Sequence, residues 1–302
     1  MPINLNKYFN KFKNKPIIGI VPPPMINDDP KHFLYLNQGY INYFKKIKLN
    51  FVIIPYNISL NRMNDYFNNI EGIFISGARI GNYNKTEEFI QQYERIDYIL
   101  KKVLEMNKTG RIFPLFASCH GIQSIIKTTE NKIHNFKVFK RLDAVNYKAK
   151  LDFINNNTNN IIKYKNYNCQ LAQHNCTFGI TPKMFNRTKK LKKMYNIVAV
   201  ARDRRNKKFV DFIKHKTYPI YAFQFHPEKS ITGLLDEYIE GLYKSKNIRD
   251  KNNIGNIKFK PNMLDYKTYT CKKLRPRVIN VHKSGLKKTS KKSTKCHIIK
   301  IT

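Results

Sequence analysis

The sequence predicts an α/β protein in three layers, with helices packed on both faces of a central, mostly parallel sheet. The chain has 302 residues, of which 41% are hydrophobic, so it can bury a sizeable core. From Pro16 to about Ser245, short apolar runs alternate with amphipathic stretches of helical length. This alternation is typical of a parallel sheet whose two faces are both covered by helices.

Short apolar runs mark the expected strands. The run Ile17-Ile18-Gly19-Ile20-Val21 is typical of a buried strand, and the three prolines that follow at 22–24 end it. Further strands are expected at 51–55, 73–75, 112–117, 197–201, 209–213 and 220–225.

Apolar residues at helical spacing mark the expected helices. Residues 33–47 place Leu36, Tyr40, Phe44 and Ile47 on one face, and this spacing predicts a helix over the whole stretch. Further helices are expected at 86–106, 121–129 and 231–243. The Asn-rich stretch at 155–168 is expected to be a loop.

The charge of the chain is strongly positive and unevenly distributed. The 57 basic and 20 acidic side chains give a formal net charge of +37. Such an excess attracts polyanions, although a lysine-rich proteome with a solvated surface explains it equally well. From Ser245 onward the periodicity fades and lysines cluster. We therefore divide the chain into an N-terminal extension (1–15), a central domain (16–244) and a basic, partly disordered C-terminal appendage (245–302), which nucleic acid or another polyanion would contact.

The cysteines and the N-terminus set further limits. Five cysteines without a Cys-x-x-Cys pair do not favour a disulfide scaffold or a zinc ribbon, and we expect no metal site. Residues 1–15 lack an apolar run of signal-peptide length, so we expect a cytoplasmic protein. No stretch approaches 18 apolar residues, so no membrane span is expected.

The segment 113–121 has the layout of a nucleophile elbow. An apolar strand leads through Ala117 and Ser118 to Cys119, and Gly121 opens a helix. A sharp turn between strand and helix needs small neighbours, and the positive end of the helix favours a thiolate. The alternative is a buried structural cysteine at the end of a strand.

A second segment, 218–229, delivers a histidine at the end of an apolar strand. His226 is followed by Pro227, which makes the turn rigid, and by Glu228. A catalytic base needs a third group that orients it, and the Glu228 carboxylate can accept a hydrogen bond from the imidazole. A surface histidine beside a proline turn is the alternative.

A third strand, 72–75, ends in Ser76-Gly77-Ala78. Small residues at the end of a strand allow a close approach of the backbone, whose N–H groups could stabilise an oxyanion. A plain turn is the alternative.

Together these segments resemble the γ-glutamyl hydrolases and, more broadly, the class I glutamine amidotransferases. Tyr218–Lys229 is similar to the family's histidine strand, typically YPVYGVQWHPEK, and Gly72–Ala78 to its strand GILFPGG. The resemblance covers about 16–235 in the expected order. The chain departs from the family pattern at five positions, which are Ser76, Ala78, Ala117, His120 and Phe225.

The resemblance implies the following roles and fold. The fold would be the flavodoxin-like, three-layer fold of the class I glutamine amidotransferases. Cys119 would attack a γ-glutamyl amide and form a thioester, His226 would be its base and Glu228 would orient His226. The backbone N–H groups of Ala78 and His120 would form the oxyanion hole. His174 and Gly77 would contact the substrate.

The resemblance also implies the substrate and the partners. The substrate would be a folylpoly-γ-glutamate or a related γ-glutamyl compound, and no cofactor would be needed. The oligomeric state stays open, with a homodimer as one option. Two other functions stay open. One is a glutaminase subunit that supplies ammonia to a synthase, and the other is a degenerate relative that binds nucleic acid through its basic tail.

Overall fold

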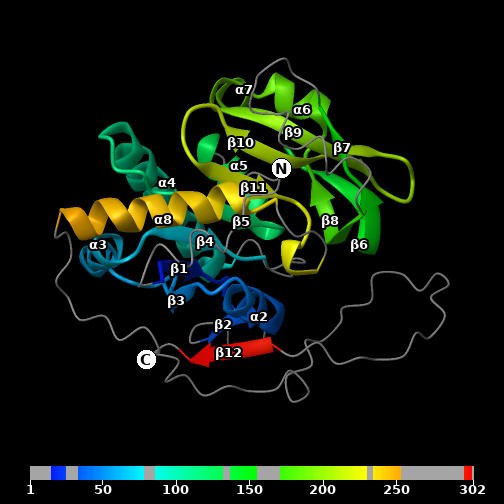
Figure 1. Ribbon diagram of the computed structural model, residues 1–302. Helices are drawn as coiled ribbons and strands as arrows, with labels where there is room; N and C mark the ends of the chain where they lie inside the picture. The colour runs from blue at the N-terminus through cyan, green and yellow to red at the C-terminus, as the bar shows by residue number, and fades with distance from the viewer. Residues whose placement is uncertain are drawn as a thin grey trace.

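An eight-stranded sheet forms the centre of the protein. The computed structural model describes residues 15–24, 33–77, 86–131, 137–154, 171–229, 234–252 and 296–300. The sheet has the strand order β3-β1-β4-β5-β11-β10-β9-β7 (Figure 1). Its strands are β1 (Ile17–Val21), β3 (Asn50–Ile53), β4 (Gly72–Ile75), β5 (Leu115–Ser118), β7 (Asp152–Phe153), β9 (Tyr195–Arg202), β10 (Lys208–His215) and β11 (Ile220–Phe223).

The sheet is parallel on one side and antiparallel on the other. Strands β3, β1, β4, β5 and β11 run parallel to one another, whereas β10, β9 and β7 are added in antiparallel fashion. The parallel strands are joined through helices, as the alternation in the sequence predicts. Their carboxyl ends therefore meet at one edge of the sheet, where ligands commonly bind in such folds.

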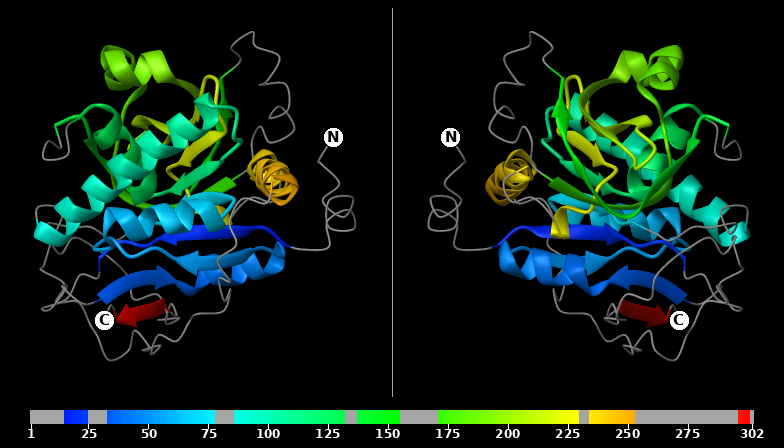
Figure 2. Two further views of the ribbon diagram at one scale, coloured as in Figure 1. Left: turned by 90° about the vertical axis from the view of Figure 1, so that its left-hand side faces the viewer. Right: turned by 90° about the vertical axis from the view of Figure 1, so that its right-hand side faces the viewer.

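Helices cover both faces of this sheet, and the predicted three-layer α/β fold is confirmed. Helices α2 (Gln38–Lys46) and α8 (Asp236–Lys251) pack on one face. Helices α3 (Leu60–Asn69), α4 (Glu87–Lys108), α5 (His120–Thr129), α6 (Pro182–Arg187) and α7 (Lys189–Met194) pack on the other (Figure 2). Among the described residues, no helix has the length and apolar character that crossing a membrane requires.

Two small sheets lie outside the central one. Strands β6 (Lys140–Lys150) and β8 (Leu171–Gly179) pair with each other in antiparallel fashion, and their inward residues join the same core as α2 and α8. Strand β2 (Phe33–Asn37) pairs with β12 (Cys296–Lys300). The sequence pattern did not predict strands β2, β6, β7, β8 and β12 or helices α3, α6 and α7. The loop expected at 155–168 lies outside the described residues.

The prediction of a single helix over 33–47 is wrong. The structure has a strand at 33–37 and begins the helix at Gln38. Leu34 and Leu36 are both fully buried, which is the period of two that a strand produces. Asn37 then caps the helix, because its side-chain oxygen accepts a hydrogen bond of 2.7 Å from the N–H of Gly39.

The last helix lies further along the chain than the expected 231–243. Helix α8 ends at Lys251, so it crosses the boundary expected between 244 and 245. The reason is a buried ion pair, in which Arg249 Nη2 lies 2.7 Å from Glu71 Oε1. The division of the chain into 1–15, 16–244 and 245–302 otherwise stays a prediction.

Candidate active site

Cys119 occupies the sharp turn between β5 and α5 that the sequence predicts. Its backbone has φ 55° and ψ −110°, a strained conformation for any residue with a side chain. The turn requires glycine at 121, since a Cβ there would lie 2.6 Å from the carbonyl oxygen of Ile75. The N–H of Cys119 donates a 2.7 Å hydrogen bond to the carbonyl of Phe223 at the end of β11. Strand and helix thus hold the thiol at the carboxyl edge of the parallel strands.

His226 and Glu228 follow the adjacent strand, β11. The Nδ1 atom of His226 lies 2.9 Å from Glu228 Oε1, and the imidazole is only 7% exposed. Glu228 belongs to the single 3₁₀ turn Pro227–Lys229 that follows the histidine. A turn this tight lets a carboxylate two residues along the chain reach back to the ring.

Gly77 shows that the thiol and the imidazole meet. A Cβ at Gly77 would lie 2.9 Å from Cys119 Cβ and 3.5 Å from His226 Cε1. The two side chains therefore border the same small space at one edge of the sheet. A side chain at residue 77 would fill it, which is the physical reason for glycine at this position.

The charges in this space act on the imidazole. Burial alone would lower the pKa of His226, but the charge of Cys119 and a hydrogen bond to it, together with the hydrogen bond and charge of Glu228, raise that pKa to about 10. The geometry thus favours an imidazolium beside the sulfur at neutral pH. A thiolate next to an imidazolium is the reactive form of a cysteine nucleophile.

Tyr40 and Ser118 complete the polar surroundings of His226. The Tyr40 hydroxyl lies 3.2 Å from His226 Nδ1 and 3.1 Å from Ser118 Oγ. Ser118 Oγ in turn donates a 2.9 Å hydrogen bond to the carbonyl of Phe225. The helical spacing of 33–47 predicts only that Tyr40 lies on a buried face, and nothing in the sequence pattern indicates that it belongs to the site.

The side chain of His120 points away from the site. It is buried against Phe89 and Tyr93 of α4, and its Nε2 lies 3.3 Å from Ser124 Oγ. Burial and the nearby Lys127 lower the pKa of His120 to about 3, so the ring is neutral. Only its backbone N–H concerns the expected oxyanion hole, and that role stays a prediction. Ala78, the other expected donor, lies outside the described residues.

His174 lies on β8, next to the strand segment that carries His226. The N–H of His226 donates a 2.9 Å hydrogen bond to the carbonyl of Gln173. His174 itself is fully buried, and its Nε2 lies 2.9 Å from Oδ1 of Asp211 on β10, which is also fully buried. Asp211 lies within the strand predicted at 209–213, but the sequence pattern did not indicate a role for it. The expected contact of His174 with substrate stays a prediction.

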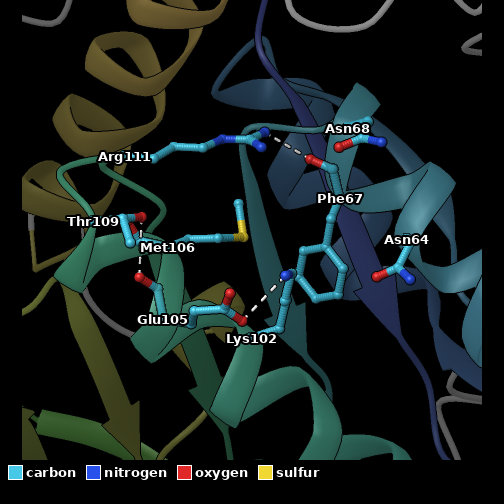
Figure 3. A pocket seen from close by; sticks show the side chains of 8 residues that line it. All are labelled: Asn64, Phe67, Asn68, Lys102, Glu105, Met106, Thr109 and Arg111. Atoms are coloured by element: carbon cyan, nitrogen blue, oxygen red, sulfur yellow. Dashed lines mark hydrogen bonds and ion pairs between the residues drawn. The ribbon is translucent and has the colours of Figure 1, made fainter.

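A metal site and a pocket away from Cys119 and His226 would be the other candidates for a functional site. Within the described ranges, no three His, Cys, Asp or Glu side chains are grouped as metal ligands would be. A pocket between α3 and α4 is lined by Phe67, Met106 and Arg111 among others (Figure 3). Arg111 already donates a 2.6 Å hydrogen bond to the carbonyl of Phe67, and none of the lining residues belongs to the site described above.

Comparison with known proteins confirms the resemblance found in the sequence. Residues 34–244 match the family of class-I glutamine amidotransferases. The chain is 31% identical over 235 residues to γ-glutamyl hydrolase B of Dictyostelium discoideum, an alignment that covers 74% of this chain and 65% of that protein. It is 28% identical over 240 residues to the probable γ-glutamyl hydrolase 3 of Arabidopsis thaliana, covering 72% and 64%. The chain thus spans slightly less than two thirds of these relatives.

Among solved structures, the glutaminase domain of Trypanosoma brucei CTPS, with bound acivicin, is similar in fold. Its TM-score is 0.52 at 13% sequence identity, and the match covers 77% of this chain and 94% of that one. An identity this low supports the fold alone.

Proposed function

The chain belongs to the class-I glutamine amidotransferase family, and from this premise we propose that it is a cysteine hydrolase that cleaves γ-glutamyl amide bonds. The observation that carries the proposal is the meeting of Cys119 and His226 across Gly77, with Glu228 bound to the far side of the imidazole. Relatives named γ-glutamyl hydrolase support the choice of bond.

In the proposed reaction, the sulfur of Cys119 attacks the γ-carbonyl carbon of the substrate. The C–N bond breaks, and protonated His226 gives its proton to the leaving amine, which leaves a γ-glutamyl thioester on Cys119. Neutral His226 then takes a proton from a water molecule that attacks the thioester. The C–S bond breaks, the γ-carboxylic acid is released, and the thiolate and the imidazolium are restored.

Each supporting group has one task in this scheme. Glu228 accepts the Nδ1–H of His226 and stabilises its positive charge. Backbone N–H groups at the start of α5 and after Gly77 would donate to the oxyanion of each tetrahedral intermediate. We propose a folylpoly-γ-glutamate or a related γ-glutamyl compound as the substrate.

The test is incubation of the protein with a folate polyglutamate and, separately, with glutamine, followed by mass spectrometry of the products. Release of glutamate or of γ-glutamyl peptides from the polyglutamate supports the proposal, and Cys119→Ala should abolish this release while the protein stays folded. Cleavage of glutamine alone would indicate a glutaminase instead. Wild-type turnover by Cys119→Ala would show that the nucleophile is assigned wrongly.

A further inference from the structure

The outer face of the β6–β8 sheet carries an array of positive charge. The outward-facing basic residues of β6 are Arg141, Lys148 and Lys150, and all three are exposed. None of them forms an ion pair with another residue that the structure describes. The inward face of the same sheet is apolar and packs on the core, so the charges lie on one side only.

The hairpin between β9 and β10 extends this array. Residues 202–208 include five exposed basic side chains, namely Arg202, Arg204, Arg205, Lys207 and Lys208. We call the outer face of β6–β8 together with this hairpin the basic platform. Its two parts are about 60 residues apart in the sequence, since the hydrogen bond from the N–H of Asp143 to Asp203 spans 60 positions.

The acidic groups of the basic platform are already occupied. Asp203 is only 3% exposed and accepts hydrogen bonds from the N–H groups of Arg205 and Lys207. Burial opposes these hydrogen bonds, yet together they lower the pKa of Asp203. Asp143 is paired with Arg204 at 3.1 Å and with Arg205 at 3.7 Å. These carboxylates fix the hairpin in place, and the exposed cations of β6, namely Arg141, Lys148 and Lys150, remain available to a ligand.

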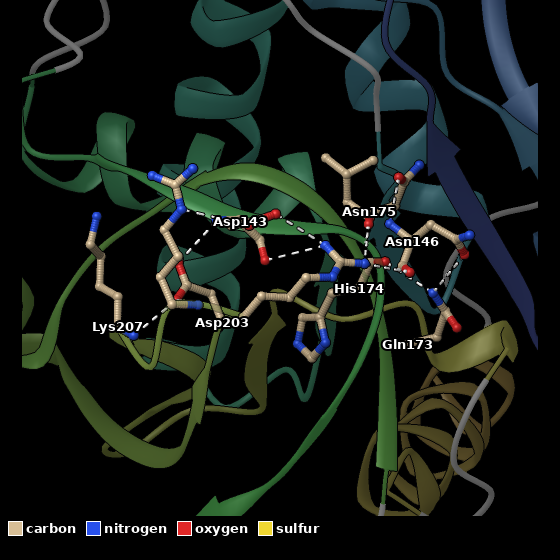
Figure 4. Close-up of polar contacts among 10 residues, drawn as sticks. Asp143, Asn146, Gln173, His174, Asn175, Asp203 and Lys207 are labelled. Atoms are coloured by element: carbon tan, nitrogen blue, oxygen red, sulfur yellow. Dashed lines mark hydrogen bonds and ion pairs between the residues drawn. The ribbon is translucent and has the colours of Figure 1, made fainter. Parts of the chain in front are cut away.

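Direct hydrogen bonds fasten the hairpin to the sheet. Arg204 Nη2 donates to the carbonyls of Val145 and Asn146, at 2.9 and 3.0 Å (Figure 4). Lys207 Nζ donates to the carbonyl of Arg141 at 2.8 Å. The cations are therefore carried by a connected framework rather than by a free loop, which reduces the entropy lost when a charged ligand binds.

The basic platform begins beside the candidate active site. Gln173 accepts the hydrogen bond from the N–H of His226, and Lys148 is the partner of Gln173 in the β6–β8 register. Neighbouring strands lie about 4.8 Å apart, so the backbone of Lys148 is about two strand spacings, roughly 10 Å, from that of His226. A ligand held at Cys119 and longer than this distance can reach the platform.

We propose that the basic platform binds the part of a poly-γ-glutamate chain that extends beyond the scissile bond. This inference rests on the proposed function and adds a binding surface to it. In a γ-linked chain every glutamate keeps a free α-carboxylate, so a long substrate presents a row of negative charges. Nucleic acid would also be attracted by the cations, but the position of Lys148 beside His226 favours a polyanion that is held at the reaction centre.

The first experiment compares γ-glutamyl substrates of two chain lengths. For each variant the ratio of KM for a long chain to KM for a γ-glutamyl dipeptide is measured at low ionic strength. Replacement of both Lys148 and Lys150 by Gln should raise this ratio about fivefold, and added salt should remove the difference. The matched control is Lys189→Gln with Lys193→Gln, which removes two exposed charges from α7, the helix labelled at the top of Figure 1, and should leave the ratio unchanged.

Arg205 tests whether a longer substrate runs along the basic platform away from His226. It is 81% exposed and lies beside Asp143, five residues before Lys148 along β6, which corresponds to roughly 15 Å. Arg205→Gln should therefore raise KM only for chains longer than those that already respond to Lys148→Gln. If both variants respond at the same chain length, or if the α7 control raises the ratio equally, the platform is not a substrate-binding surface.

Direct binding separates this inference from the proposed function. A fluorescent oligo-γ-glutamate is titrated into Cys119→Ala protein, with and without the Lys148 and Lys150 replacements, and anisotropy reports the Kd. Weaker binding in the replaced protein supports the platform even if wild-type protein cleaves no γ-glutamyl bond, a result that would refute only the proposed function. Equal Kd values overturn the platform. Tighter binding of an oligonucleotide of the same charge, lost through the same replacements, would assign the surface to nucleic acid instead.

Discussion

The hydroxyl of Tyr40 lies 3.2 Å from Nδ1 of His226, and its other contacts fix the direction of this hydrogen bond. Ser118 gives its proton to the carbonyl of Phe225, so its oxygen must accept from Tyr40. The single proton of Tyr40 is then used, and its oxygen accepts from His226. Nδ1 therefore carries a hydrogen, and Nε2 is left for the exchange of a proton with Cys119.

Replacement of Tyr40 by Phe should consequently lower kcat and shift its pH profile. The variant loses one acceptor for Nδ1, and a hydrogen bond of this kind contributes about 1 kcal/mol, so a fall in kcat of about fivefold to tenfold is expected. The pH profile of kcat should shift as well, because the imidazolium loses a partner. Steady-state kinetics over a pH series measures both effects.

Tyr238→Phe is the control for this substitution. Tyr238 is also buried, and its hydroxyl donates one hydrogen bond of 3.1 Å to the carbonyl of Ile73, away from His226. It should lose a similar amount of stability in urea denaturation while its pH profile stays that of the wild type. Identical profiles for Tyr40→Phe and wild type would contradict a role for the tyrosine in orienting His226.

Glu228→Gln tests the charge that supports the imidazolium. Removal of a carboxylate 2.9 Å from Nδ1 should lower the pKa of His226 from its raised value of about 10. His226 must be protonated to assist the leaving amine, so activity is lost as the pH rises through this pKa. The alkaline limb of the kcat/KM profile should therefore move to lower pH.

The paired Glu237→Gln variant shows whether such a shift is specific. Glu237 lies on α8 and is bound to Lys214 at 2.8 Å, so its loss changes net charge equally without touching His226. Its alkaline limb should stay in place. A common shift in both variants would mean that net charge, and not the contact with Nδ1, sets the pH dependence.

Gly77 and Gly241 make a contrasting pair of glycine substitutions. A Cβ at Gly77 would lie 2.9 Å from Cys119 Cβ and 3.0 Å from the Tyr40 hydroxyl, so Gly77→Ala should displace both and reduce kcat at least about tenfold. A Cβ at Gly241, inside α8, would meet Pro114 at 3.4 Å, which is ordinary contact. Gly241→Ala should therefore raise the free energy of unfolding by up to about 1 kcal/mol, because alanine favours a helix. Kinetics and urea denaturation measure the two outcomes, and full activity in Gly77→Ala would argue against this crowded space.

The sequence predicted those parts of the site that depend on local geometry. A strand, small residues and a glycine-opened helix define the turn at Cys119, and the turn after His226 brings Glu228 back to its ring. These features need only a few consecutive residues. The parallel order of the strands then places both turns at the same edge of the sheet, so their meeting also follows from the pattern.

Contacts between distant segments could not be predicted in this way. Helical spacing places Tyr40 on a buried face, but the residue that it meets depends on how α2 lies on the sheet. The buried pair of His174 and Asp211 joins β8 to β10, and β8 was not recognised as a strand. Its partner β6 has irregular register, and Asn146 has a positive φ of 47°, so the alternation typical of a strand is interrupted there.

Lys127 should make the free energy of unfolding depend on pH, and replacing this lysine should remove that part of the pH dependence. Its side chain is fully buried, and Nζ lies 3.7 Å from the centre of the Tyr93 ring. Burial lowers the pKa of Lys127 from 10.5 to about 7. Between these two values the unfolded chain binds one proton more than the folded chain at this residue, so its contribution to the free energy of unfolding rises with pH.

Lys127→Met keeps the length of the side chain and removes the charge. The variant should be more stable than the wild type at pH 7, and the difference between their free energies of unfolding should shrink as the pH rises toward 10. Urea denaturation at several pH values measures this difference. Lys101→Met, at a position where the side chain is 72% exposed, should give a difference that changes little with pH. If the Lys127→Met difference were equally constant, the lysine would keep its proton in the folded state, held by the ring of Tyr93.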